Sequence, residues 1–149
     1  MKYVIDASAL VEGFEAPVGD ATVLITPGVE REVRLKSLHM LEYIVVEPDK
    51  SCIDKVVSVA RNSGDLDVLS DTDIEVLALA YQERAVLITD DYAMQNVAEH
   101  LGLKWRPVHQ RGITKKLRWK WRCTGCGKYY SNNYETCPVC GSRLRRVPK

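Results

Sequence analysis

The stretch that decides the fold is LSDTDIEVLALAYQERAVLITDDYAMQNVAEHLG, residues 69–102. Its first half has a Ser or Asp in the place of a helix cap, followed by apolar residues at helical spacing. VLIT (86–89) is a compact run typical of a buried strand, and residues 90–102 predict a further helix that ends at Gly102. This part of the chain is therefore expected to form a helix, a strand and a second helix.

The residues before this stretch repeat the same alternation of strands and helices. Short apolar runs predict strands, and segments with helical spacing follow each of them: KYVID (2–6), ASALVEGF (7–14), ATVLIT (21–26), PGVEREVRLKSLHMLEYI (27–44), YIVVEP (43–48) and SCIDKVVSVARNSG (51–64). Thr26 is placed as a helix cap with Pro27 at the first helical position. The alternation predicts an α/β fold, a parallel sheet with helices on both faces.

The charge of the chain divides it into two regions. Residues 1–104 hold 9 Lys and Arg against 19 Asp and Glu, a net charge of −10, whereas residues 105–149 hold 12 Lys and Arg against one Glu, a net charge of +11. We place an acidic domain at 1–104, a basic linker at 105–116 and a second domain at 117–149. The basic part is suited to a polyanion such as a nucleic acid.

Four acids of the first domain occupy positions that a parallel sheet would bring together. Asp6 ends the first strand, Asp91 follows the VLIT strand, and Glu32 and Asp73 are expected in the first turns of helices. An acid in such a position can also be a simple helix cap, which is the reading we favour for Asp71. Clustered carboxylates repel one another unless a hard cation neutralises them, so the set predicts one or two Mn²⁺ or Mg²⁺ ions.

The four acidic segments VIDASAL, TPGVEREV, LSDTDIEVLALA and LITDDYAMQNVA resemble the successive motifs of PIN-domain ribonucleases. The resemblance implies that Asp6, Glu32, Asp73 and Asp91 bind the catalytic metal, with Ser8 and Thr89 as accompanying hydroxyls. A second acid lies close to three of these positions, at Glu30, Asp71 and Asp90. Which acid of each pair binds the metal directly stays open. There is no P-loop, so no nucleotide cofactor is expected.

The cysteines of the second domain form two CxxC pairs, Cys123 and Cys126, then Cys137 and Cys140. Paired thiolates at this spacing favour one tetrahedral zinc ion over a pair of redox dithiols. A closed site with four protein ligands leaves no position for substrate. We therefore expect a small zinc ribbon in which the zinc is structural.

Basic and aromatic residues alternate around these cysteines, a composition typical of RNA binding because phosphates and unstacked bases are both accommodated. The alternative is a solvated charged face with aromatics that fill a small core. The candidate RNA-binding residues are Lys115, Lys116, Arg118, Lys120, Arg122, Lys128, Tyr129, Tyr130, Arg143, Arg145 and Arg146.

The order of a PIN-like domain, the run GITKKLRWKWRCTGCGKYY (112–130) and a zinc ribbon resembles the Nob family of endonucleases that mature small-subunit rRNA, particularly its archaeal members. The resemblance implies cleavage of precursor 16S rRNA near its 3′ end within the pre-ribosomal small subunit. The sequence has no apolar run long enough to cross a membrane and no secretion signal at MKYVIDASAL, so we expect a cytoplasmic protein without a membrane. Two alternatives remain: a non-catalytic RNA-binding assembly factor and a toxin-type PIN ribonuclease with another RNA target.

Overall fold

Five parallel strands form the sheet of the first domain in a computed structural model that describes residues 1–11, 21–35, 42–108, 112–113 and 115–149. The strands are β1 (Lys2–Ile5), β2 (Thr22–Ile25), β3 (Ile44–Val45), β4 (Val86–Ile88) and β5 (Trp105–Arg106). Their order is β3-β2-β1-β4-β5. The chain moves outward from β1 in both directions, so the carboxyl ends of β1 and β4 flank a topological switch point, where ligands bind in such sheets.

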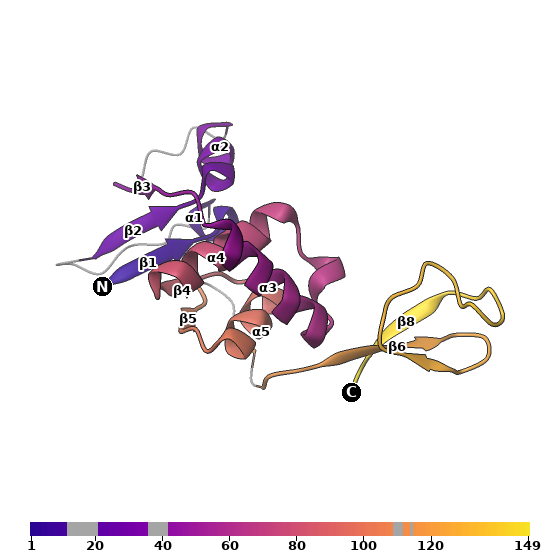
Figure 1. Ribbon diagram of the computed structural model, residues 1–149. Coiled ribbons are helices and arrows are strands. Elements are labelled where there is room, and N and C mark those ends of the chain that lie inside the picture. The colour runs from indigo at the N-terminus through magenta and orange to yellow at the C-terminus, as the bar shows by residue number, and fades with distance from the viewer. Residues whose placement is uncertain (12–20, 36–41, 109–111, 114) are drawn as a thin grey trace.

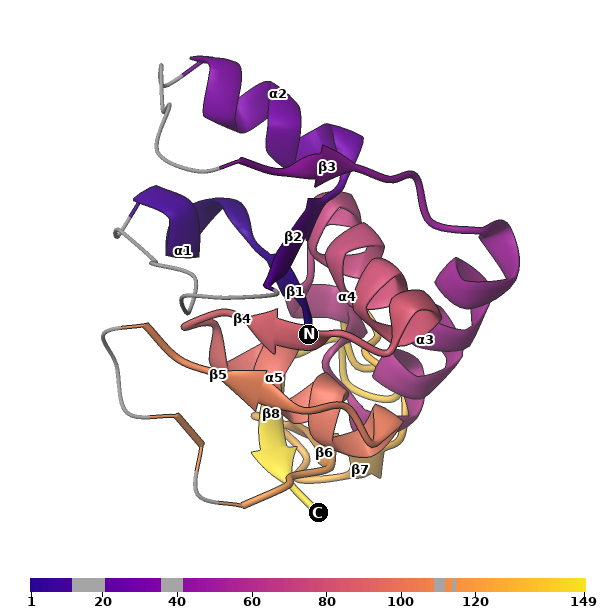
Figure 2. The ribbon, with the colours of Figure 1, turned by 90° about the vertical axis from the view of Figure 1, so that its left-hand side faces the viewer.

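Helices cover both faces of this sheet, as the alternating pattern predicts. They are α1 (Ala7–Val11), α2 (Pro27–Leu35), α3 (Lys50–Ser63), α4 (Asp71–Glu83) and α5 (Tyr92–Leu101), with a 3-10 turn at Leu66–Val68. Figures 1 and 2 show α3, α4 and α5 together on one side of the sheet and α1 on the other. This division is what right-handed crossovers dictate, because the strand order reverses direction after β3.

Capping residues set the bounds of the helices where the sequence placed them. The Thr26 hydroxyl accepts a hydrogen bond from Val29 N (3.2 Å), so α2 begins at Pro27. Ser70 and Asp73 form a reciprocal capping box at the start of α4. Gly64, with φ +84°, ends α3 in the left-handed conformation that glycine adopts without strain.

The core of the first domain lies between the sheet and α4. The apolar side chains of β1, β2 and β4 that form this core are almost fully buried. Helix α4 adds a continuous apolar block from Val76 to Ala80, in which every residue is 0% exposed. Because both faces of a parallel sheet are covered, its strands read as unbroken apolar runs. This core fixes the strand ends from which the candidate site residues project.

The second domain is a three-stranded antiparallel sheet in the order β7-β6-β8, made of β6 (Trp119–Cys123), β7 (Tyr129–Tyr130) and β8 (Leu144–Pro148). It lies at one end of the molecule in Figure 1, beyond α3 and α5. The sequence pattern missed one element: β5 pairs with β4 within the segment 105–116, where we expected only a linker. A two-residue strand carries too little periodicity to be recognised.

Parts of three predicted segments lie outside the described residues. They are residues 12–14, 36–41, and 109–111 with 114. None of the helices that the structure describes is both long and apolar enough to cross a membrane.

Candidate active site

Asp6 is the most buried acid of the candidate site. Its carboxylate is 6% exposed at the end of β1 and accepts hydrogen bonds from Ser8 Oγ (2.9 Å) and Ala9 N (2.7 Å) on one oxygen and from the Thr89 hydroxyl on the other. Burial raises the pKa of Asp6, and nearby Asp73 adds to the rise, while the three hydrogen bonds oppose it. The site thus holds a carboxylate that a cation would stabilise.

Thr89 connects the ends of two strands at the switch point. Its fully buried hydroxyl donates to Asp6 and accepts a hydrogen bond from the backbone N–H of Asp91 (3.1 Å). The residue follows β4, which pairs with β1 in parallel, so the two strand ends lie side by side. Thr89 therefore fixes the position of Asp6 relative to the loop that carries Asp91.

Asp91 and Asp73 each use one carboxylate oxygen to cap a helix. Asp91 Oδ1 accepts from Ala93 N (2.8 Å) and Met94 N (3.2 Å) at the start of α5, and Asp73 Oδ2 accepts from Ser70 N (3.0 Å). These bonds orient both carboxylates without occupying all their lone pairs. Capping and metal binding are thus compatible at both positions.

The structure corrects the expected place of Glu32. Because α2 begins at Pro27, Glu32 is its sixth residue and lies in the second turn rather than the first. Glu30 is the acid of the first turn, and it forms an ion pair with Arg34 (3.4 Å). One turn of α2 therefore separates the helix start from Glu32, which faces the same cavity as Asp6.

A cavity of about 260 Å³ brings the four predicted acids together. It is lined by Asp6, Ala7, Ser8, Glu32, Ser70, Thr72, Asp73, Val76 and Asp91. The hydroxyls of Ser70 and Thr72 are lining groups that we did not predict, because Ser70 reads from sequence only as a helix cap. The residue assignments made from the acidic motifs thus converge on one place in the fold.

The three neighbouring acids do not line this cavity. Asp90 Oδ1 accepts a hydrogen bond from Val108 N (2.7 Å), and Glu30 is paired with Arg34. Asp71 is exposed in the first turn of α4. This geometry favours Glu32, Asp73 and Asp91 over their neighbours as metal ligands.

The donor set of the cavity fits a hard divalent cation, since carboxylate and hydroxyl oxygens are the ligands that Mg²⁺ and Mn²⁺ prefer. Within the described part of the chain, only the four ribbon cysteines bring three or more potential ligand atoms within 4.8 Å of one another. No three of the four acids of the cavity therefore meet that condition among the described residues. The metal would retain several waters there.

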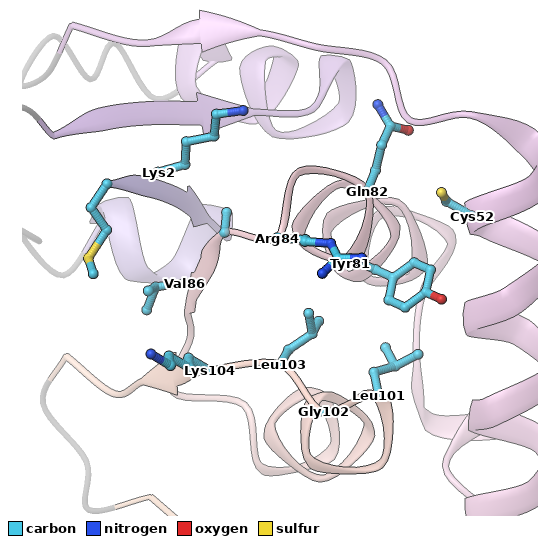
Figure 3. A pocket seen from close by; sticks show the side chains of 12 residues that line it. Lys2, Cys52, Tyr81, Gln82, Arg84, Val86, Leu101, Gly102, Leu103 and Lys104 are labelled. Atoms are coloured by element: carbon cyan, nitrogen blue, oxygen red, sulfur yellow. The ribbon is translucent and has the colours of Figure 1, made fainter.

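A larger cavity, about 640 Å³, lies at the opposite edge of the sheet, at the amino ends of the strands. Figure 3 shows Lys2, Arg84 and Lys104 around a floor formed by Leu101 and Leu103. Size alone would make it the leading site. Its lining includes no carboxylate that could hold a divalent cation, so we assign the chemistry to the smaller acidic cavity.

The four predicted zinc ligands converge in the second domain. The Sγ atoms of Cys123, Cys126, Cys137 and Cys140 all lie within 4.8 Å of one another, and none of these cysteines forms a disulfide. A hydrogen bond from the Tyr130 hydroxyl, 3.2 Å from Cys137 Sγ, is the main cause that lowers the pKa of Cys137 to about 6. The group can bind one zinc ion through thiolates.

Strand alternation divides the predicted RNA-binding residues between two faces of the ribbon. Arg122 pairs with Tyr129 on β7 and with Arg145 on β8, so these three side chains share one face with Lys120. Lys120 Nζ lies 4.1 Å from the centre of the Tyr129 ring, and that ring is 51% exposed. This basic face is adjacent to a cavity of about 390 Å³ lined by Arg122 and Arg145.

The opposite face of the ribbon carries Trp119, Trp121, Tyr130 and Arg146 and serves packing instead. Trp121 is 6% exposed, the Tyr130 hydroxyl contacts the zinc site, and Arg146 stacks on Trp119 at 4.1 Å. Arg146 also extends to the first domain. Tyr130 and Arg146 therefore have structural partners that the sequence pattern did not reveal.

The other predicted RNA contacts are all solvent-exposed: Lys115, Lys116, Arg118, Lys128 and Arg143. Lys128 Nζ lies 5.8 Å from the centre of the Tyr130 ring. Exposure leaves these cations available to phosphate groups.

Comparisons with known proteins agree with this geometry. A family described as the PIN domain of ribonuclease matches residues 3–82. Endoribonuclease Nob1 of Pyrococcus abyssi is 37% identical over 154 residues, with 100% of this chain and 95% of the relative covered. Endoribonuclease Nob1 of Archaeoglobus fulgidus is 38% identical, with 97% and 91% covered.

The chain is also similar to two proteins with other names. Ribonuclease VapC1 of Thermoplasma acidophilum is 36% identical, with 98% of this chain and 78% of the relative covered. The solved structure of VapBC-1 from nontypeable Haemophilus influenzae superposes with a TM-score of 0.52 at 15% identity, covering 74% of this chain and 100% of that one. At that identity the likeness concerns the fold alone.

Proposed function

The chain belongs to the Nob1 family of PIN-domain endoribonucleases, and we propose that it hydrolyses precursor 16S rRNA near its 3′ end during assembly of the small ribosomal subunit. Its cofactors are one structural zinc and one or two Mn²⁺ or Mg²⁺ ions. The observation that carries the proposal is the 260 Å³ cavity in which Asp6, Glu32, Asp73 and Asp91 meet. The disulfide-free thiols fit a reducing compartment such as the cytoplasm.

The chain's own residues hold the site in a defined geometry. Thr89 and Ser8 orient the Asp6 carboxylate, and the first turn of α5 orients Asp91. The four acids of the cavity, Asp6, Glu32, Asp73 and Asp91, would hold the cation. When bound, the cation would activate water and offset the charge that develops on the phosphodiester. No side chain is needed as a nucleophile, because water would attack the phosphorus. The P–O3′ bond would break and the 3′ oxygen would take up a proton, so the products would carry 5′-phosphate and 3′-hydroxyl ends.

The basic face of the ribbon supports an RNA substrate. The nuclease domain has a net charge of −10 and repels a polyanion, whereas Lys120, Arg122 and Arg145 gather positive charge around the exposed ring of Tyr129. Cations contact phosphates and the ring offers a face for an unstacked base. Affinity therefore resides mainly in the ribbon, and the chemistry in the acidic cavity.

The test incubates the purified, zinc-loaded chain with a short RNA that spans the 3′ end of mature small-subunit rRNA, with Mn²⁺ or with no added divalent cation. We expect cleavage at one position, dependent on metal and abolished by Asp6→Asn. The matched control is Asp71→Asn, an exposed acid outside the cavity. Binding without cleavage by a folded protein would instead support the non-catalytic assembly factor.

The similarity to Ribonuclease VapC1 keeps a toxin-type ribonuclease with another RNA target as the second candidate. The two functions differ in the cell. A toxin-type enzyme arrests growth on expression and cleaves RNAs without the rRNA 3′ end, whereas the maturation enzyme does neither.

A further inference from the structure

The buried amide of Gln95 joins the candidate active site to the segment between the two domains. Gln95 is 0% exposed on α5. Its Nε2 donates to the backbone carbonyl of Thr89 (2.9 Å), and its Oε1 accepts from the backbone N–H of Ile113 (3.0 Å). One side chain thus contacts the residue that orients Asp6 and a residue of the interdomain segment.

The next residue, Asn96, holds the same segment at a second point. It is 4% exposed, and its amide group forms a two-sided clasp on the backbone of Leu117: Oδ1 accepts from Leu117 N (2.7 Å) and Nδ2 donates to Leu117 O (2.9 Å). His100 Nε2 lies 2.8 Å from the same carbonyl. A pair of reciprocal bonds defines both the place and the direction of the chain at Leu117, two residues before β6 begins.

A third contact continues this attachment into the ribbon itself. Asp65 is 1% exposed, and its Oδ2 accepts hydrogen bonds from Ser63 Oγ (2.7 Å) and Asn96 Nδ2 (2.6 Å). Its Oδ1 lies 3.5 Å from Nη1 of Arg146 on β8. Arg146 also donates to Gly64 O (3.4 Å). A Cβ on Gly64 would lie 2.5 Å from the Cβ of Trp119, so this closeness of the domains requires glycine.

We propose that Gln95 and Asn96 are positioning residues of the nuclease: they clamp the segment between the domains to α5, so that the ribbon presents bound RNA to the acidic cavity in one register. The inference rests on the proposed function. Its geometric basis is that Asp91 is the N-cap of α5 and that the same helix carries Gln95 and Asn96 about one turn later. The same helix therefore positions both the proposed metal ligand Asp91 and Leu117, from which the chain enters the ribbon.

The clamp differs from ordinary core packing in what its loss should change. A side chain that only stabilises the fold would alter cleavage of every RNA alike. A clamp matters only for an RNA long enough to contact both the ribbon and the cavity, because only that RNA depends on the domain arrangement. Selectivity for long RNA and the spread of cut positions are thus its specific readouts.

The experiment uses full-length, zinc-loaded chains with Asn96→Ala or Gln95→Met, the latter retaining volume while removing both hydrogen bonds. Asn62→Ala, at an exposed position of α3, is the control. Hydrogen exchange at the amides of Leu117 and Ile113 reports the clamp directly. Residual dipolar couplings report whether both domains share one orientation, and cleavage is measured on one RNA that spans both domains and on a short one that does not.

In the parent we expect the Leu117 and Ile113 amides to be protected from hydrogen exchange. We also expect one alignment tensor to fit the residual dipolar couplings of both domains. Asn96→Ala should lower the protection of Leu117 at least about tenfold, because it removes the acceptor of this amide and two further bonds of the Asn96 side chain. Gln95→Met should lower the protection of Ile113 by about tenfold, because it removes the acceptor of that amide. Asn96→Ala should cut the long RNA more slowly and at several adjacent bonds, with the short RNA unaffected. Gln95→Met also loses its bond to Thr89 O, so it should slow the short RNA as well, but slow the long RNA more.

Two results would overturn the inference. One is a parent in which the residual dipolar couplings of the two domains require separate alignment tensors, or in which the Leu117 amide exchanges freely. The other is a folded variant that has lost protection yet cuts the long RNA at the parental position and rate. If the parent cuts no RNA, the proposed function fails instead, while exchange and alignment still decide whether the clamp exists.

Discussion

Replacing Thr89 by valine removes one hydroxyl from the centre of the site while keeping the side-chain shape. Thr89 is fully buried, so valine leaves no cavity, but the hydrogen bond donated to the Asp6 carboxylate and the one accepted from Asp91 N disappear, together with a weak contact to Met94 Sδ (3.6 Å). A bond to a charged group contributes about 1.5–3 kcal/mol and a neutral one about 0.5–1.5 kcal/mol. We expect unfolding to become easier by about 2–4 kcal/mol.

The substitution also raises the pKa of Asp6 further, because the Thr89 hydrogen bond lowers that pKa in the parent. Metal binding needs the ionised carboxylate, so the acid limb of the cleavage profile should move to higher pH. Urea unfolding in EDTA should show a midpoint lower by about 1–2 M. Thr22→Val, on the half-buried start of β2, is the control. A midpoint and pH profile like those of the parent would refute the role of the hydroxyl.

Three other predictions test separate parts of the molecule. Burial raises the pKa of Asp6, so without added Mn²⁺ or Mg²⁺ the protonated carboxyl makes a contribution to stability that is complete below its ordinary pKa and is lost as pH rises through the raised value; the unfolding free energy of Asp6→Asn should lack that decline with pH. Zinc chelation, or Cys137→Ser, should unfold the ribbon and leave the NMR spectrum of the nuclease domain in place, and loss of both spectra would contradict it. Charge removal at Lys115 and Lys116, both exposed, should reduce the salt dependence of RNA binding by about 0.7 per lost phosphate contact; an unchanged slope would exclude them from the interface.

The sequence predicted the nuclease fold because its local signals agree with one another. Apolar runs, the Thr26 cap, the Ser70 capping box and the glycine stops all point to the same alternation of strands and helices. It did not predict β5, a two-residue strand that exists because β4 offers it a paired edge. A contact made only in the folded sheet leaves no local pattern.

Asp6 and Asp91 could be proposed from sequence because they follow strands whose carboxyl ends meet. Glu32 and Asp73 could be proposed because they were expected in the first turns of helices and their segments resemble PIN-domain motifs. Sequence did not place Glu32 in the second turn of α2, nor show that Asp90 holds Val108. The ribbon shows the same limit, since residue composition could not distinguish Arg122 on the basic face from Arg146 on the packed one. Such differences depend on strand pairing and on the neighbouring domain.

The most direct test of the account compares Mn²⁺-dependent cleavage by two matched sets of single variants, at saturating RNA. One set neutralises the acids of the cavity, Asp6, Glu32, Asp73 and Asp91, and the other neutralises their neighbours Glu30, Asp71 and Asp90. We predict that each member of the first set loses cleavage while RNA affinity persists, and that the second set cleaves like the parent. Cleavage that survives in the first set, or disappears equally in both, would contradict a metal site built from these four carboxylates.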